Sequence, residues 1–67
     1  ESFSISSSKP MFGNYSLIDA TGKKLLSNQV AGKNQLNINA KMLDKGIYYF
    51  VFYNEQNEIV SHKLIKQ

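Results

Sequence analysis

The chain contains no cysteine and no arginine, and each absence excludes a class of protein. Without cysteine there is no disulfide scaffold, on which small extracellular domains often depend, and no thiolate metal site. A chain of 67 residues buries only about 60% of its unfolded surface, so a small hydrophobic core has to stabilise it alone. The lack of cysteine leaves the cellular compartment open.

All eight positively charged side chains are lysines, which stand singly except for the pair Lys23 and Lys24, and the net charge is +3. Arginine is the side chain that best forms bidentate contacts with phosphates and base edges. The aromatic segment 46–53 carries no charge, although an oligonucleotide-binding barrel would interleave basic and aromatic residues. We therefore interpret the charge as a solvated surface and predict no nucleic-acid partner.

Catalytic and metal-binding groups are scarce. His62 is the only histidine, whereas a triad needs a base oriented by a third group, and zinc needs several nitrogen or sulfur ligands. Asp19, Asp44, Glu55 and Glu58 fall in different predicted turns and form no calcium loop. We predict that the chain is not an enzyme and binds no metal and no cofactor.

Membrane-spanning and targeting segments are also lacking. No apolar run approaches the about 18 residues that span a bilayer, so we predict no direct membrane insertion. The chain starts without the basic and apolar stretches of a secretion signal, and we expect it to be a piece of a longer protein.

Alternating apolar and polar residues predict β-strands along the whole chain. The predicted strands are residues 3–7, 15–19, 23–30, 35–39, 46–53 and 58–66. Turn signals separate them at intervals of about 8 to 12 residues, as in small sandwiches. We predict a single all-β domain over residues 1–67, a small Ig-like or Greek-key antiparallel β-sandwich of about six to seven strands.

The alternation also predicts which side chains face the core. Before the last hairpin, Phe3, Ile5 and Leu25 are predicted to face inward, whereas Tyr15 shares one strand face with Leu17, and Leu36 shares one with Ile38. In segment 46–53, one face carries Tyr48, Phe50 and Phe52, and the other carries Ile47, Tyr49, Val51 and Tyr53. Because both faces are apolar, either both are covered or one is open for a partner.

Glycine, proline and Asx residues predict the connections. Residues 9–14 form a loop, 19–22 and 31–34 form turns, 40–45 cross over with at most one helical turn, and 54–57 close a hairpin. In the turn 19–22, the Asp19 side chain bonds backbone amides two residues on, and Gly22 supplies a positive φ.

The spacing Leu43-x-x-Gly46-x-Tyr48 is typical of a tyrosine corner. In such a corner, a tyrosine near the start of a strand bonds the backbone a few residues upstream and fixes the crossover between sheets. The simpler interpretation, that Tyr48 is a core aromatic, is compatible with the corner.

In the order and spacing of these motifs, the chain resembles the type A C-terminal sorting domain of the type IX secretion system, also called the Por secretion system. Residues 15–26 resemble its strand–turn–strand with a D-x-x-G-K turn, and residues 35–39 its next strand. Leu43, Gly46 and Tyr48 match its L-x-K-G-x-Y element, and residues 62–66 its basic and apolar terminus. The P-N-P motif common upstream in the family is absent, and residues 9–13 form a different loop.

The resemblance implies a signal and not an activity. Such a domain directs an attached N-terminal cargo, after folding in the periplasm, through the outer-membrane type IX translocon of a Gram-negative bacterium to the cell surface or medium. A sortase-like peptidase then removes it, and the cargo is often anchored. The partners implied are the translocon, the peptidase and the cargo. The oligomeric state stays open.

The end of the chain is the predicted recognition site. If the last strand lies at a sheet edge, a receptor can extend it by β-augmentation. Lys63 and Lys66 would then orient the receptor, and Leu64 or Ile65 would supply the buried contact. The alternative interpretation of the two lysines is protection of an edge strand against aggregation.

Two other functions stay open. In a carbohydrate-binding module of a secreted enzyme, Tyr49 and Tyr53 would stack on sugar rings from an exposed face. In a protein-interaction or oligomerisation module, the face with Ile47, Tyr49, Val51 and Tyr53 would pair with another copy or with the cargo.

Overall fold

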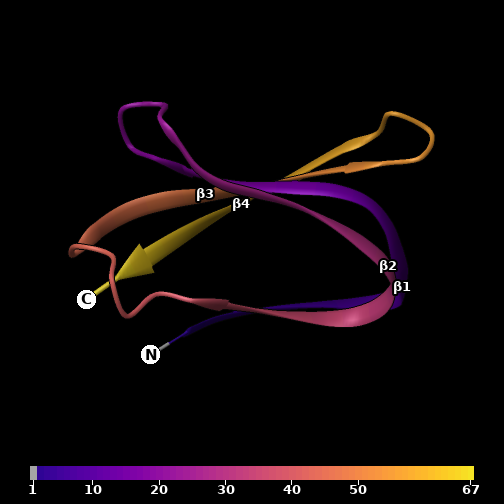
Figure 1. Cartoon of the computed structure of the whole chain (residues 1–67), viewed down its shortest axis with the longest axis horizontal. Helices are drawn as coiled ribbons and strands as arrows, with labels where there is room; N and C mark the ends of the chain where they lie inside the picture. The colour runs from indigo at the N-terminus through magenta and orange to yellow at the C-terminus, as the bar shows by residue number, and fades with distance from the viewer. Residues whose placement is uncertain (1) are drawn as a thin grey trace.

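The computed structural model describes residues 2–67, and these residues form four antiparallel strands and no helix (Figure 1). The strands are β1 (Ser2–Asp19), β2 (Lys24–Asn39), β3 (Gly46–Asn54) and β4 (Ile59–Lys66). Their order in the sheet is β2-β1-β3-β4, so β2 and β4 are the edges. Within residues 2–67, no helix is long and apolar enough to cross a membrane.

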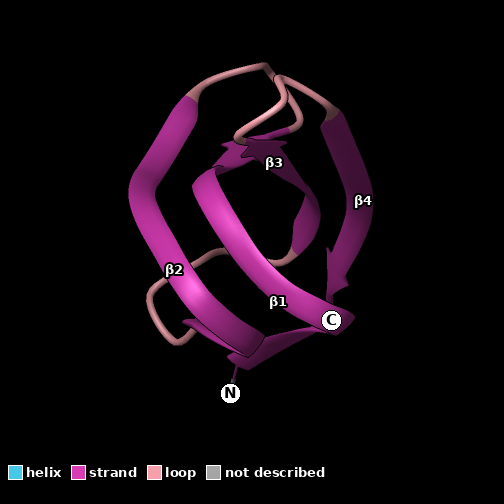
Figure 2. Cartoon of the chain, turned by 90° about the vertical axis from the view of Figure 1, so that its right-hand side faces the viewer, coloured by secondary structure: helices cyan, strands magenta, loops and turns pink. Residues whose placement is uncertain are grey.

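The two longest strands, β1 and β2, bend together in the middle (Figure 2). Ser6 pairs with Gln35 and Met11 with Lys33, so four residues of β1, 7–10, lie opposite the single residue Asn34. One step further, Met11 and Phe12 pair with Lys33 and Ala31, which leaves Gly32 of β2 unpaired with a left-handed φ of 74°. Extra residues of this kind bend a strand and increase its twist.

The bend folds the sheet onto itself, so that it has two layers (Figures 1 and 2). One layer contains β3, β4 and the halves of β1 and β2 next to their shared turn, and the other contains only residues 2–6 of β1 paired with 35–39 of β2. The buried core lies between them and consists of Ile5, Met11, Leu17, Val30, Leu36, Ile38, Tyr48, Phe50 and Phe52.

Phe50 and Leu17 are at the centre of this core, with 1% and 0% of their surfaces exposed. The Phe50 ring lies 5.5 Å from that of Tyr15, and the Tyr48 ring lies 6.3 Å from that of Phe3 in the other layer. Truncating a buried aromatic to alanine typically costs about 3–5 kcal/mol, most of the stability of a domain this small. The late aromatic strand therefore holds the two layers together.

The prediction of an all-β, antiparallel fold is confirmed, but the count of six to seven strands and the Greek-key sandwich are not. The six predicted segments lie in strands except for their first residues Lys23 and Glu58, since β2 begins at Lys24 and β4 at Ile59. The predicted loop 9–14 and the predicted turn 31–34 were wrong, because both segments lie inside continuous strands. Pro10 and Gly32 mark bulges at which β1 and β2 pass from one layer to the other.

The predicted core faces are confirmed with one exception. Tyr48, Phe50 and Phe52 are buried, whereas Tyr49 and Tyr53 on the other face of β3 are 37% and 45% exposed. Leu25, predicted to face inward, is 37% exposed. The register explains the error: Leu17 pairs with Leu26 and Ile18 with Lys24, so Leu25 is an unpaired bulge residue and the next residue packs against the core.

Candidate functional site

The predicted recognition residues lie on β4, which pairs only with β3 and is an edge of the sheet in the described part of the chain. Alternation along the strand separates them into two pairs. Lys63 and Ile65 face outward, opposite Tyr49 and Ile47, and Ile65 is 59% exposed. Leu64 and Lys66 face inward and are half-buried, and Leu64 packs against the core. Only the first pair is freely presented.

Lys66 ties the end of the chain to the crossover, residues 40–45. Its Nζ donates hydrogen bonds to the carbonyl oxygens of Ala40 and Leu43, the latter at 2.6 Å. The Ala40 residue is fully buried, and the crossover is further closed by a bond of 3.0 Å from the Leu43 N–H to the Ala40 carbonyl. A charged donor satisfies carbonyls that would otherwise lose their hydration on burial. Lys66 therefore stabilises the crossover.

The tyrosine corner fixes the same crossover from the other side. Tyr48 is 6% exposed, and its Oη donates a hydrogen bond of 2.6 Å to the Asp44 carbonyl oxygen, as the spacing predicted. Leu43 packs against the core, and Gly46, the first residue of β3, pairs with Lys66. The motif residues Leu43, Gly46 and Tyr48 and the last residue of β4 therefore meet in one structural unit.

The β1–β2 turn is built around Asp19, as predicted. Its Oδ1 accepts hydrogen bonds from the Thr21 N–H at 2.9 Å, the Thr21 hydroxyl at 2.6 Å and the Lys23 N–H at 3.0 Å. These bonds, the Thr21 hydroxyl first, lower the pKa of the Asp19 carboxyl. Gly22 has a φ of 90°, which a residue with a Cβ adopts only under strain.

The β3–β4 turn repeats this design. The Asn54 Oδ1 accepts from the N–H groups of Gln56 at 3.0 Å and Glu58 at 2.8 Å. Asn57, which corresponds to Gly22 in position, has a φ of 63°. Asparagine is one of the few non-glycine residues that tolerate this region. Both hairpins are thus closed by an Asx residue followed three positions later by a left-handed one.

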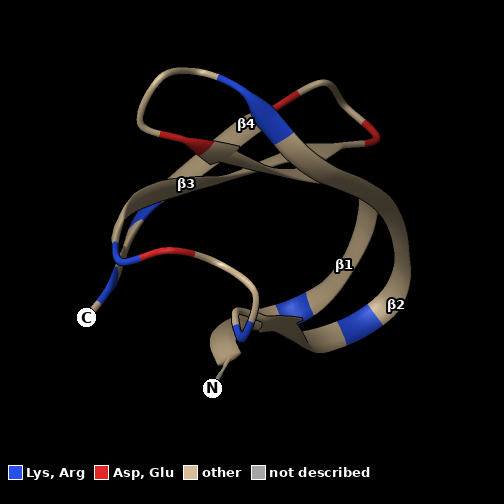
Figure 3. Cartoon of the chain, turned by 60° about the vertical axis from the view of Figure 1, so that its left-hand side comes forward, with Lys and Arg blue, Asp and Glu red and all other residues tan. Residues whose placement is uncertain are grey.

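The outward face of the β3–β4 hairpin is apolar except at Ser61 and Lys63, and it is uncovered in the described chain. Cross-strand neighbours there include Ile47 with Ile65 and Tyr53 with Ile59, and Ile59 is 61% exposed. The lysines do not gather on one such face but lie on separate parts of the chain (Figure 3). Among residues 2–67, no group of three or more histidine and acidic side chains is placed to hold a metal ion.

Sequence reasoning found the corner, the Asx turn at Asp19 and the position of the β3–β4 hairpin turn, but missed the Asn54 side-chain bonds and the Lys66 contacts. The two carbonyl acceptors lie 26 and 23 residues upstream of Lys66, beyond the reach of any local pattern. The available signal was the position of Lys66 in the alternation of the strand, because a lysine whose side chain points inward needs hydrogen-bond acceptors there.

The comparisons with known proteins agree with the family resemblance that the sequence motifs indicated. The family model described as secretion system C-terminal sorting domain matches residues 1–67, the whole chain. The search of curated proteins and the search of solved structures gave no match. The carbohydrate-binding alternative receives no support from these comparisons.

Proposed function

Because the chain belongs to the C-terminal sorting domain family of the type IX secretion system, we propose that β4 is the element that the secretion machinery recognises. Domains of this family are signals and not catalysts, and they direct export to the cell surface or medium in Gram-negative bacteria. The domain functions attached to an N-terminal cargo and interacts with the type IX machinery. We take residues 1–67 as one sorting unit, since the family model spans them all.

The proposed mode of recognition is pairing of a receptor strand with the free edge of β4. The observation that carries it is the edge position of β4, which among residues 2–67 has a neighbouring strand on one side only. A strand added there gains main-chain hydrogen bonds, and alternate side chains give it specificity. On the outward face, Lys63 contributes attraction to a carboxylate and Ile65 an apolar contact.

Leu64 and Lys66 support recognition by positioning β4 and not by contacting the receptor. Leu64 packs against the core and Lys66 bonds the crossover, so both hold β4 in place. Their role in sorting is to present the edge in a fixed geometry, because an ordered strand avoids the entropy cost of ordering on binding. Truncation of the chain end would therefore remove recognition and stability together.

The proposed partners are the outer-membrane translocon and a sortase-like peptidase. The cargo and its sorting domain fold in the periplasm, the signal engages the translocon, and the peptidase removes the domain afterwards. A folded signal suits this route, since the same surface has to be presented on unrelated cargo.

The experiment is an export assay with this chain fused behind a fluorescent reporter in a bacterium that has the type IX system. The test variant is the double substitution Lys63→Glu with Ile65→Ser, and its matched control is Lys33→Glu with Leu25→Ser on β2. We expect export to fall about tenfold or more for the first, the factor that corresponds to 1.4 kcal/mol of lost binding, and to stay within about twofold for the control. Equal export of both variants, with both folded, would exclude recognition through the outward residues of β4.

A further inference from the structure

The two layers of the folded sheet differ in width, and the first half of the inner face of β4, at Val60 and His62, is consequently uncovered. The wider layer has four strands, whereas the other contains only segments 2–6 and 35–39. Val60 pairs with Phe52 on the core side of the hairpin, yet Val60 is 44% exposed and Phe52 only 8%. His62, the next inward residue, is also exposed although its ring lies 6.3 Å from that of Phe50.

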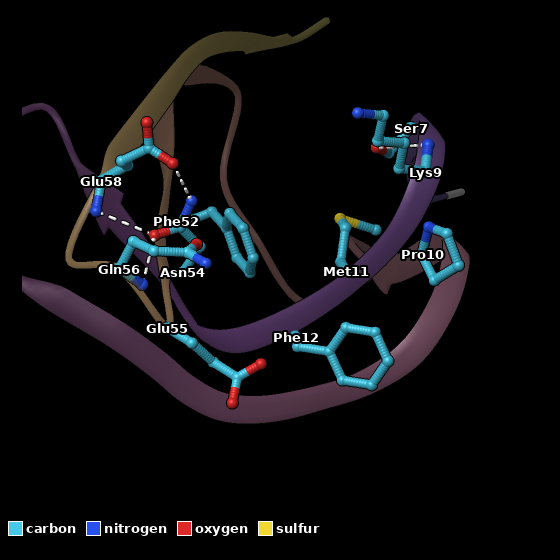
Figure 4. A pocket seen from close by; sticks show the side chains of 10 residues that line it. All are labelled: Ser7, Lys9, Pro10, Met11, Phe12, Phe52, Asn54, Glu55, Gln56 and Glu58. Atoms are coloured by element: carbon cyan, nitrogen blue, oxygen red, sulfur yellow. Dashed lines mark hydrogen bonds between the residues drawn. The ribbon is translucent and has the colours of Figure 1, made fainter.

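A groove runs along this uncovered strip. Its apolar part is a cavity of about 140 Å³ between β1 and β4, lined chiefly by Ile5, Met11, Phe50, Phe52, Val60 and His62. It continues, through shared walls at Ser7, Met11 and Phe52, into a hollow of about 450 Å³ beside the β3–β4 turn. Figure 4 shows that hollow, with Glu55 and Glu58 on the hairpin side and Lys9 and Pro10 on the β1 side. We call the two together the inter-edge groove.

Free strand edges flank the inter-edge groove. Residues 2–6 of β1 pair with β2 only, and β4 pairs with β3 only, so the facing edges carry no neighbour in the described chain. Residues 2–66 are already committed to the four strands and their three connections, which leaves no segment within them to fill the gap. Whatever covers it comes from outside these residues.

We propose that the inter-edge groove takes an extended segment of a separate protein, which pairs with the free edge of β1 and covers Val60 and His62 on the inner face of β4. Its chemistry follows from the lining. Side chains that alternate along a strand would place aliphatic groups in the cavity at Ile5 and Val60 and polar groups toward solvent beside Ser4.

The charge at one end specifies the segment further. Two carboxylates, Glu55 and Glu58, and one lysine, Lys9, line the hollow, so this end has a negative balance; Glu58 also accepts a hydrogen bond of 2.6 Å from the Asn54 side-chain amide. A cationic side chain at the end of the segment nearest the β3–β4 turn complements it. A segment antiparallel to β1 places that cation at its own amino end, because β1 runs toward Met11 and the hollow.

The choice of a separate protein rests on the proposed function. A sorting domain operates behind unrelated cargo, so a groove filled by cargo would present a different surface in each case. A strand supplied by the shared secretion machinery meets the same groove every time. This site is distinct from the outward residues Lys63 and Ile65, so the two contacts can be tested separately.

The first test is direct binding. The probe is a capped heptapeptide with an amino-end lysine followed by alternating threonine and valine, and the control peptide has the same composition with the three valines adjacent. We expect the probe to shift the NMR signals of Ile5 and Val60, not that of Ile47, and to bind at least about tenfold more tightly than the control, a difference of 1.4 kcal/mol. Equal binding of the two peptides, or shifts confined to the outward face, would overturn the proposal.

The second test separates the possible sources of the strand. The same probe is titrated into the reporter fusion, and we expect the affinity found with the isolated chain. Loss of binding in the fusion would show that the attached polypeptide fills the groove and would overturn a separate partner.

The third test is export. Val60→Lys puts a charge into the groove at a site exposed enough to leave the fold intact, and Leu25→Lys is the matched control on β2. With thermal unfolding of both confirmed within a few degrees of the parent, we expect Val60→Lys to lower export about tenfold or more and the control to change it less than about twofold. If the parent fusion is exported and Val60→Lys is exported equally, the groove proposal fails; if the parent itself is not exported, the sorting function fails.

Discussion

Replacing Lys66 by methionine isolates the contribution of its ammonium group. Methionine keeps an unbranched apolar stem of similar length, so packing along β4 is conserved while the two hydrogen bonds to the Ala40 and Leu43 carbonyls are lost. A hydrogen bond to a charged group contributes about 1.5–3 kcal/mol when it is deleted, but Lys66 is half-buried and water replaces part of the interaction. We expect a loss of about 2 kcal/mol in the free energy of unfolding.

For a domain of this size, 1 kcal/mol shifts Tm by about 4–8 °C, so Tm should fall by roughly 8–16 °C. The assay is thermal and urea unfolding followed by circular dichroism. The matched control is Lys63→Met, on the outward face of the same strand, which should change the unfolding free energy by less than about 0.5 kcal/mol. If the two variants are equally stable, Lys66 does not hold the crossover.

A double-mutant cycle extends the test to the tyrosine corner. Tyr48→Phe removes only the hydroxyl that bonds the Asp44 carbonyl, in the crossover that Lys66 also bonds. Groups that stabilise one shared segment should show a coupling energy of about 0.5 kcal/mol or more, whereas independent sites add. Additivity within about 0.3 kcal/mol would show that the corner and Lys66 act separately.

Three further predictions concern the β1–β2 turn and the corner. Tyr48→Phe alone should lower the unfolding free energy by about 1–2 kcal/mol in urea titrations, because the Asp44 carbonyl loses its donor, and an unchanged value would contradict the corner. Gly22→Ala should lower the free energy of unfolding by about 1–2 kcal/mol, because a residue with a Cβ is strained at the φ of 90° found here. Equal stability of the variant and the parent would mean that the turn relaxes to another conformation. Because the folded state lowers the pKa of Asp19, the Asp19 carboxylate stabilises the fold fully above its ordinary pKa of about 3.9, and this stabilisation is lost as the pH falls below that value through the lowered pKa. Asp19→Asn should therefore flatten this part of the pH–stability curve. An unaltered curve would show that the Asp19 carboxylate does not stabilise the turn.

The parts of the fold that local rules govern were predictable. Alternation placed Tyr48, Phe50 and Phe52 together on one face, which the structure shows to be the buried one, and the Asx and glycine pattern located the turn at Asp19. The corner spacing foretold the bond from Tyr48 to Asp44, because donor and acceptor are four residues apart. Each of these depends on neighbours close in sequence, where steric and hydrogen-bond rules leave few choices.

The strand count failed for a reason specific to Pro10 and Gly32. Both residue types end strands or mark bulges, and the local sequence is the same in the two cases. A strand ends at such a residue if its pairing with the neighbouring strand stops there, and it only bulges if the pairing resumes beyond that residue. Here β1 and β2 bulge at the same level, pair again beyond it and bend together. The position of Leu25 depended in the same way on a register shift that only the pairing reveals.

By itself, the order of residues determined that the chain is β-structured, which faces of its strands are apolar, where the hairpins close and which family its motifs resemble. Tertiary structure alone decided that two strands bend as a pair, that Lys66 faces inward to carbonyls 26 and 23 residues away while Lys63 stays outside, and that a groove lies between two free edges. The division has one cause: a side chain's local conformation depends on its sequence neighbours, whereas its partners across layers are set by how the whole sheet folds over.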